Sequence, residues 1–193
     1  MLLDTEAERK LEQFRAHLLD VNRRINLVSR KNSSQVVDGL IADSLAILAL
    51  FDYPIATRLL DIGSGAGFPW IVHKIARPDL RIVSVDASQR KIEFQRESAR
   101  LLGLADCEFH AARIESLPQL GVDFCIAKAF GRVELICELA GKHLNPAGRL
   151  LLPRSATEPV DIEAIGALGF GFERETAYEA VGKQAKLLVL RRQ

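Results

Sequence analysis

The chain has 193 residues, of which 48% are hydrophobic and 26% are charged, and its formal net charge is +1. This size predicts one globular domain that can bury both faces of a sheet. The near-neutral charge excludes binding of nucleic acid through bulk basicity, so any such contact needs a local basic surface.

The chain shows no sign of export or membrane insertion. Residues 1–10 are acidic and polar where a signal peptide would be apolar. The longest apolar stretch, residues 40–51, contains Asp43 and is too short to span a bilayer. Three cysteines without a Cys-x-x-Cys spacing are typical of buried thiols in a reducing compartment. We therefore expect a cytoplasmic protein without a membrane anchor.

Two helices are predicted at the start of the chain. Residues 6–19 and 34–50 carry apolar side chains at helical spacing, and the polar stretch 29–34 separates them. We expect a helical cap over residues 1–55, followed by the core of the protein at residues 56–193.

In the core, short apolar runs alternate with helical segments. Strands are predicted at residues 58–62, 81–86, 107–110, 122–127 and 149–152. Helices are predicted at residues 68–76, 133–144 and 159–168, and between Ser88, which can cap a helix, and Gly103, which can end it. This alternation predicts a parallel sheet with right-handed crossovers.

The chain ends in a different pattern. Residues 170–178 and 183–190 are two further strands, and the connection between them is too short for a helical crossover. They must form an antiparallel hairpin, which puts one reversed strand at the end of the parallel sheet. We therefore predict an α/β fold of the class I S-adenosylmethionine-dependent methyltransferase type, which is Rossmann-like, with an N-terminal helical cap.

A glycine-rich stretch closes the first strand of the core. It reads Asp61-Ile62-Gly63-Ser64-Gly65-Ala66-Gly67. Ligands of open α/β sheets bind beyond the carboxyl ends of the strands, and glycines let the backbone approach them closely. Asp86 ends the next strand, where a carboxylate can accept hydrogen bonds from both hydroxyls of a ribose.

This pattern admits more than one interpretation. Glycine-rich turns also occur without ligands, but the acid at the end of the next strand favours a nucleotide cofactor. The stretch lacks the G-x-G-x-x-G spacing of dinucleotide-binding proteins. Asp61 and the terminal hairpin favour S-adenosylmethionine. A nicotinamide-dependent oxidoreductase is the alternative, although no Tyr/Lys or His/Asp set for hydride transfer is evident.

Several short motifs occur in an order typical of one enzyme family. They are Asn26-Leu27-Val28-Ser29, Asp43-Ser44-Leu45, the glycine stretch extended to Phe68-Pro69, Ala76-Arg77-Pro78-Asp79, Arg113-Ile114-Glu115, Ala129-Phe130 and residues 186–192. On these motifs the chain resembles the small-subunit (16S) ribosomal RNA guanine-N7 methyltransferase family, also called glucose-inhibited division protein B. The resemblance implies methylation of N7 of a guanine in small-subunit ribosomal RNA, as free RNA or in a 30S particle.

The resemblance also implies which residues bind the cofactor. They are Asp61, Gly63, Ser64, Gly65, Phe68, Asp86, Ile114, Glu115 and Lys128. Asp86 would hold the ribose, and Ile114 and Glu115 would meet the adenine. Lys128 stands where the family usually has Arg, and it would position cofactor and substrate. No general base is expected, because guanine N7 has a free lone pair.

Basic residues in the cap and near the strand ends are candidates for RNA contact. They are Arg23, Arg24, Arg30, Lys31, Arg132 and Arg154, although any of them could equally be a solvated surface charge. Trp70, at a position where the family usually has Gly, would lie at the mouth of the site, where it could stack on a base or pack against the cap. The four histidines lack ligand spacing, so no metal is expected, and the protein is expected to be a monomer.

Departures from the family pattern cluster on the substrate side. Lys128 keeps the usual charge but loses the planar fork of Arg. Two alternatives therefore stay open, namely a protein of the same fold that binds the cofactor without transferring methyl groups, and an enzyme with a protein or small molecule as acceptor.

Overall fold

The computed structural model describes residues 3–180 and 182–193. Its helices are α1 (Thr5–Asn22), α2 (Ser33–Ala49), α3 (Trp70–Ala76), α4 (Gln89–Leu101), α5 (Val133–Gly141) and α6 (Ile162–Ala167), with a short 3-10 helix at Ile114–Ser116. Its strands are β1 (Arg58–Ile62), β2 (Arg81–Asp86), β3 (Cys107–Ala111), β4 (Val122–Ile126), β5 (Leu144–Ser155), β6 (Phe170–Ala180) and β7 (Lys183–Arg192).

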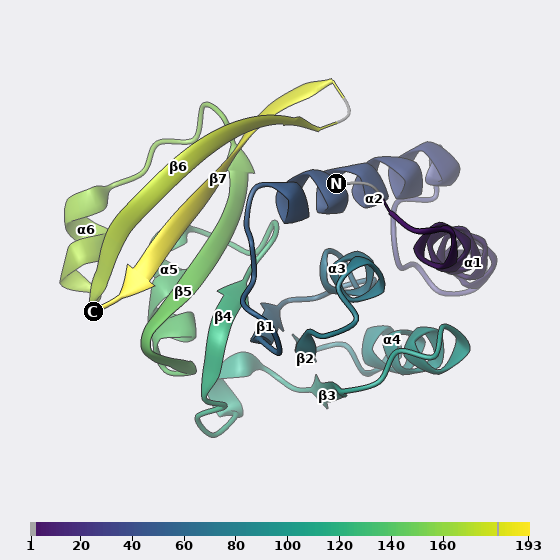
Figure 1. Cartoon of the computed structure of the whole chain (residues 1–193), viewed down its shortest axis with the longest axis horizontal. Coiled ribbons are helices and arrows are strands. Elements are labelled where there is room, and N and C mark those ends of the chain that lie inside the picture. Colours follow the sequence, from purple (N-terminus) through teal and green to yellow (C-terminus); the bar gives the residue numbers. More distant parts are fainter. Residues whose placement is uncertain (1–2, 181) are drawn as a thin grey trace.

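The strands form one seven-stranded sheet in the order β3-β2-β1-β4-β5-β7-β6 (Figure 1). Strands β1 to β5 pair in parallel, whereas β7 runs antiparallel to both of its neighbours. The predicted fold class is confirmed. The reversed strand, however, is not at the edge of the sheet, because β7 lies between β5 and β6.

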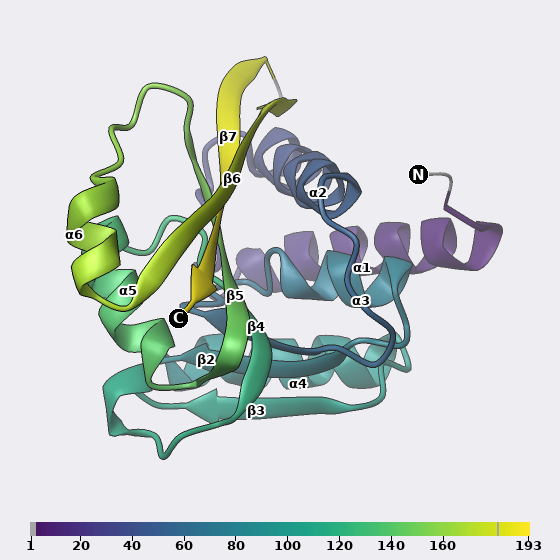
Figure 2. The ribbon, with the colours of Figure 1, turned by 60° about the vertical axis from the view of Figure 1, so that its left-hand side comes forward.

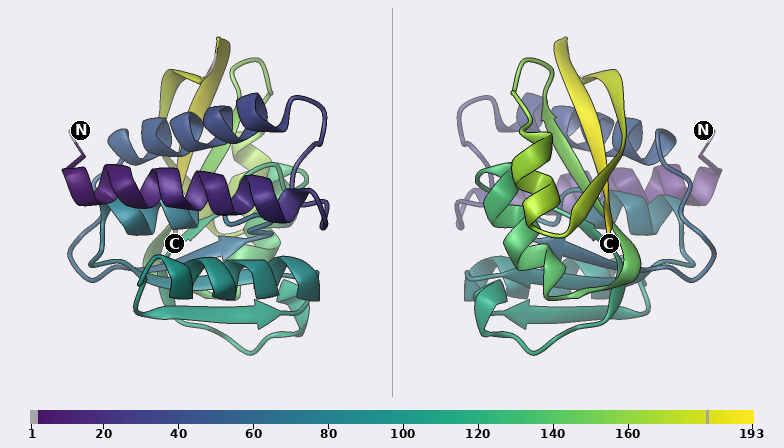
Figure 3. Two further views of the ribbon diagram at one scale, coloured as in Figure 1. Left: turned by 90° about the vertical axis from the view of Figure 1, so that its right-hand side faces the viewer. Right: turned by 90° about the vertical axis from the view of Figure 1, so that its left-hand side faces the viewer.

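Helices cover both faces of the sheet. The cap helices α1 and α2 share one apolar core with α3, α4 and one face of the sheet, and α5 and α6 cover the other face (Figure 3). The hairpin of β6 and β7 extends beyond the sheet, where β6 contacts α2 (Figure 2). None of the described helices is long and apolar enough to cross a membrane.

The cap is joined to the rest of the chain by aromatic packing. The ring of Phe14 on α1 lies 5.4 Å from that of Phe68 after the glycine loop and 6.4 Å from that of Phe94 on α4, between ring centroids. All three rings are buried. The predicted division of the chain at residue 55 stays a prediction.

Several element boundaries differ from the predicted ones. The helix predicted over residues 133–144 ends at Gly141, because β4 pairs with the chain around Leu144 and draws it into β5. Helix α6 begins only after Asp161, whose carboxylate accepts the N–H of Ala164 and caps the helix. Ser88 takes the N-cap position of α4 as predicted, but its hydroxyl makes no capping bond.

Candidate functional site

The glycine loop follows β1 at the centre of the sheet. Gly63, Gly65 and Gly67 all have positive φ angles, which favour glycine. Added Cβ atoms would lie 2.3 Å from the ring of Phe130 at Gly63 and 2.3 Å from the side chain of Ile71 at Gly67. At both positions the backbone conformation and the close packing therefore require glycine.

Asp86 ties the loop to the end of β2. One carboxylate oxygen accepts the N–H of Gly65 at 2.9 Å, and the other accepts the N–H of Ser88 at 2.8 Å. The ammonium group of Lys91 lies 3.9 Å away, and the Asp86 side chain is 11% exposed. Asp86 thus shapes the loop and keeps part of its carboxylate accessible.

A cavity of about 320 Å³ opens between the glycine loop and the ends of the neighbouring strands. We call it the glycine-loop cavity. Four of the predicted cofactor residues line it, and Ala129 and Phe130 close it on the β4 side; the predicted residues are Gly63, Asp86, Ile114 and Glu115. Ile114 is buried and offers an apolar wall, whereas Glu115 is exposed.

A buried hydrogen-bond network connects the glycine loop to α4. The side-chain amide of Gln95 on α4 donates to the carbonyl of Gly65 at 2.7 Å and to the hydroxyl of Ser64 at 2.9 Å. Its oxygen accepts the indole N–H of Trp70 at 2.8 Å and the hydroxyl of Ser84 on β2. The four side chains are buried. The sequence analysis did not single out Gln95.

Trp70 does not lie at the mouth of the site. Its indole is 0% exposed and packs edge-on against Phe109, with ring centroids 5.7 Å apart. Stacking on a base is excluded in this structure, because the ring is used to support the loop. Phe68 is also buried, with its ring against the cap rather than in the glycine-loop cavity, so its contact with a cofactor stays a prediction.

Asp61 is a buried carboxylate beside the loop. One oxygen accepts the N–H of Trp70 at 3.4 Å, and the other has no hydrogen-bond partner within residues 3–180 and 182–193. Burial raises the pKa of Asp61 well above its usual range. A buried acceptor without a partner is a group that a bound ligand or water can satisfy.

His73 on α3 connects the loop region to the cap. Its Nε2 lies 3.0 Å from the carbonyl oxygen of Ser44 on α2, and Nδ1 lies 3.5 Å from the hydroxyl of Tyr53. Burial lowers the pKa of His73 to about 4. Within the part of the chain that the structure describes, no three His, Cys, Asp or Glu side chains are grouped as a metal site requires.

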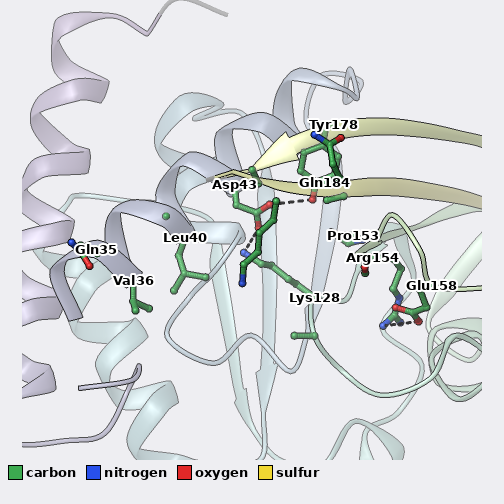
Figure 4. Close-up of a pocket in the computed structure, with 16 residues that line it drawn as sticks. Gln35, Val36, Leu40, Asp43, Lys128, Pro153, Arg154, Glu158, Tyr178 and Gln184 are labelled. Atoms are coloured by element: carbon green, nitrogen blue, oxygen red, sulfur yellow. Dashed lines mark hydrogen bonds and ion pairs between the residues drawn. The ribbon is translucent and has the colours of Figure 1, made fainter. Parts of the chain in front are cut away.

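A larger cavity of about 730 Å³ lies next to the first, between α2, the ends of β4 and β5, and the β6–β7 hairpin (Figure 4). We call it the hairpin cavity. Ala129 lines both cavities, so the chain that follows β4 separates them. The polar side chains in its wall include Asp43, Lys128, Arg154, Glu158 and Tyr178.

Lys128 joins three elements around this cavity. Its ammonium group forms an ion pair with Asp43 on α2, and the two side chains are 17% and 15% exposed. The other oxygen of Asp43 accepts the hydroxyl of Tyr178 on β6 at 3.1 Å (Figure 4). Burial and the charge of Asp43 raise the pKa of Tyr178 above its usual value. The predicted Lys128 is therefore held in place by a carboxylate from the cap.

The predicted RNA contacts fall into two groups. Arg154 lines the hairpin cavity and is largely buried. The others are exposed and line neither cavity; they are Arg23, Arg24, Arg30, Lys31 and Arg132. The first four lie in the connection between α1 and α2, and the α2 residues Gln35 and Val36 line the hairpin cavity.

The sheet order and the glycine loop between β1 and β2 define a class I methyltransferase fold. A SAM-dependent methyltransferase from Aquifex aeolicus has a TM-score of 0.62 at 18% identity, covering 79% of this chain and 91% of that chain. TrmN from Thermus thermophilus has a TM-score of 0.58 at 20% identity, covering 78% of this chain and 48% of that one. At these identities the likeness shows the fold alone.

Sequence relatives identify the family. The family described as rRNA small subunit methyltransferase G (GidB) matches residues 7–168. The ribosomal RNA small subunit methyltransferase G of Geobacter sp. (strain M21) is 37% identical over 175 residues, which are 86% of this chain and 80% of the relative. That of Cereibacter sphaeroides is 37% identical over 186 residues, 94% of this chain and 88% of the relative. The chain belongs to the rRNA small subunit methyltransferase G family, so the resemblance is confirmed.

Proposed function

We propose that this enzyme transfers the methyl group of S-adenosylmethionine to N7 of a guanine in small-subunit (16S) ribosomal RNA. Its family membership supports the reaction class and the RNA. One structural observation carries the proposal beyond the family name. Two cavities meet at Ala129, one bordered by the glycine loop and Asp86, the other by Lys128 and Arg154.

The residues of the glycine-loop cavity fit the proposed cofactor. Asp86 can accept hydrogen bonds from the two ribose hydroxyls, and Ile114 offers an apolar surface to the adenine. Asp61 does not line this cavity but directly precedes Ile62 and Gly63, which do, and its oxygen without a partner among residues 3–180 and 182–193 can accept a hydrogen bond from the ammonium group of the methionine part. A cation bound there would favour the charged form of Asp61, which burial alone disfavours.

In the proposed reaction these residues act by positioning the methyl donor and the acceptor. The cofactor supplies a methyl group activated by a sulfonium, and guanine N7 offers a lone pair that carries no proton. The chain therefore needs no general base. Its contribution is to hold the two reacting atoms about 3–3.5 Å apart and in line. Lys128 is suited to this task because Asp43 holds it in the wall of the hairpin cavity, next to Ala129, which lines both cavities.

The acceptor side must also bind RNA and present one base. Removing a base from its stack costs a few kcal/mol, which contacts along the strand can offset. The exposed basic residues at the α1–α2 connection lie next to the α2 end of the hairpin cavity, where they suit a phosphate backbone. One copy of the chain supplies both cavities, which supports the expectation of a monomeric enzyme.

The test is methyl transfer to undermethylated small ribosomal subunits and to free 16S RNA, with labelled S-adenosylmethionine. We expect the label as 7-methylguanine in the RNA, and its loss in both Lys128→Ala and Asp86→Ala. Cofactor binding without label in either RNA substrate would contradict the proposal. It would support the alternatives, a non-catalytic cofactor-binding protein or an enzyme with another acceptor.

A further inference from the structure

Among the residues that the structure describes, Tyr178 is the one aromatic side chain in the wall of the hairpin cavity. The pairing of the strands fixes the face on which it lies. Tyr178 on β6 is opposite Ala185 on β7, and Ala185 is opposite Ser155 on β5. Directly opposite residues have side chains on the same face of a sheet, and all three line the cavity. This face packs against the cap, because Leu151, four residues before Ser155, belongs to the apolar core that includes the cap helices.

The ring of Tyr178 is held in place by its hydroxyl group. The hydroxyl donates to the carboxylate of Asp43 on α2 at 3.1 Å, and the same carboxylate forms the ion pair with Lys128 (Figure 4). The Tyr178 side chain is nevertheless partly exposed. A ring that is fixed before binding loses little conformational entropy when a ligand packs against it.

The rest of the hairpin cavity combines apolar walls with a few polar groups. Val36, Leu40 and Asp43 lie on one face of α2 and line the cavity, and Lys128 contributes a cation (Figure 4). The volume of about 730 Å³ is within the ordinary range of small-molecule sites. A nucleobase suits such a cavity, because its faces stack on aromatic rings and its edges form hydrogen bonds.

We propose that the acceptor guanine leaves the RNA stack and packs face-on against the ring of Tyr178 in the hairpin cavity. This inference rests on the proposed function and deepens it by naming the surface that binds the base. Stacking on Tyr178 offsets part of the cost of removing the base from the RNA. Lys128 shares Asp43 with Tyr178 and directly precedes Ala129, which lines both cavities. Two polar contacts therefore connect the ring to the boundary with the glycine-loop cavity.

The alternative is that Tyr178 only fastens the hairpin to the cap through Asp43. The two roles depend on different parts of the side chain. Tyr178→Phe removes the hydroxyl and keeps the ring, whereas Tyr178→Leu removes both and keeps an apolar side chain. The difference between these two variants therefore isolates the ring. The matched control is Phe172→Leu, which removes an exposed aromatic ring of the same strand that does not line the cavity.

The experiment measures kcat and KM for methyl transfer to undermethylated small subunits, the Kd for S-adenosylmethionine, and stability in urea. We expect kcat/KM of Tyr178→Leu to be about 5- to 150-fold below that of Tyr178→Phe, the range of one lost base–aromatic stack. Tyr178→Phe should stay within about fivefold of the wild type, because it keeps the stacking surface. The cofactor Kd should stay within about twofold in every variant, because Tyr178 does not line the glycine-loop cavity.

A second variant tests the cavity without touching Tyr178. Ala185→Leu adds bulk beside the ring and should raise KM for the small subunit at least about tenfold through steric exclusion, with an unchanged cofactor Kd. Equal kcat/KM in Tyr178→Phe and Tyr178→Leu would overturn the proposal, and so would a loss matched by weaker cofactor binding or an unchanged KM in Ala185→Leu. If the wild-type protein methylates no ribosomal RNA, the proposed function itself fails. Methylation by the wild type with equal Phe and Leu variants defeats this inference alone.

Discussion

The two cavities are built in different ways. The glycine-loop cavity is formed by residues that directly follow neighbouring strands, and hydrogen bonds from Asp86 and Gln95 hold its loop. The hairpin cavity is assembled from α2, the β4 connection, the end of β5 and the terminal hairpin, and it is held by ion pairs such as Asp43 with Lys128. Under the proposed function, cofactor binding would therefore depend on local geometry, whereas acceptor binding would depend on how distant segments pack.

The largest expected effect is on cofactor binding alone, without an effect on the binding of small subunits. We expect Asp86→Ala to weaken binding of S-adenosylmethionine at least a hundredfold, because it removes two hydrogen bonds to a charged group, worth about 1.5–3 kcal/mol each. Isothermal titration calorimetry measures this change. Cofactor-free binding to small subunits should be unaltered, and Asp86→Asn should show an intermediate loss. A cofactor Kd within a few fold of the wild type would contradict the assignment of Asp86.

Substitutions in the buried hydrogen-bond network of Gln95 should have the next largest effect, on the stability of the fold. Gln95→Leu removes the partner of the indole N–H of Trp70 and the bond to the carbonyl of Gly65, whereas the hydroxyls of Ser64 and Ser84 keep the hydrogen bond between them. We expect a loss of about 2–4 kcal/mol in the free energy of unfolding, measured with urea. Trp70→Phe is the milder comparison, because it removes a single donor, and should cost about 1–2 kcal/mol. Equal stability of Gln95→Leu and the wild type would show that the network does not support the loop.

His73 links α3 to the cap helix α2, and its effect depends on pH. The pKa of His73 is about 4 in the folded protein, below the ordinary value of 6.5, so the unfolded chain binds more protons between these values. Stability should therefore fall as pH decreases through this window, with a contribution from His73 of about 2 kcal/mol between pH 7 and pH 5.

The variant His73→Gln isolates this contribution from other titrating groups, including Asp61 and the charged pair of Asp43 and Lys128. Urea unfolding at pH 7 and pH 5 measures it. We expect the variant to be less stable than the wild type at pH 7 and to lose less stability on acidification. An identical pH dependence in the two proteins would show that His73 keeps its ordinary pKa.

The smallest effect concerns the ion pair of the hairpin cavity. We expect a coupling energy of about 1 kcal/mol between Asp43 and Lys128 in a double-mutant cycle with Asp43→Asn and Lys128→Met, because both side chains are mostly buried. Urea unfolding gives the energies. If the four stabilities are additive, the pair does not hold the cap against the β4 connection.

The difference between the two cavities also explains which features could be predicted from the sequence. The bounds of β1 and β2 match the prediction, because apolar runs that end in glycine or aspartate have few alternative structures. The glycine loop and Asp86 were predicted for the same reason. The hairpin was predicted too, since its connection is short. The position of β7 inside the sheet was not, because a short connection fixes the hairpin but not which of its two strands pairs with β5.

The missed features depend on burial, which a single sequence does not display. Gln95 stands among the charged residues of α4 and resembles a residue of a solvated helix face, yet it faces the loop. Trp70 was expected at the mouth of the site, because a loop sequence does not tell which side of the loop a side chain takes. Arg154 resembled other basic surface residues until the packing of the hairpin placed it in a cavity wall.

The place of β7 in the sheet also constrains the order in which the strands can pair while the chain is being synthesised. Within residues 3–180 and 182–193, strand β6 pairs with β7 alone, so it cannot join the sheet until residues 183–192 have been synthesised. Until then β5 is an open edge that carries the buried residues Leu150 to Leu152, and such an edge is prone to pair with other chains. Strands β1, β2 and β4, which frame the glycine-loop cavity, precede the hairpin in the chain, so the frame of this cavity is synthesised before that of the hairpin cavity.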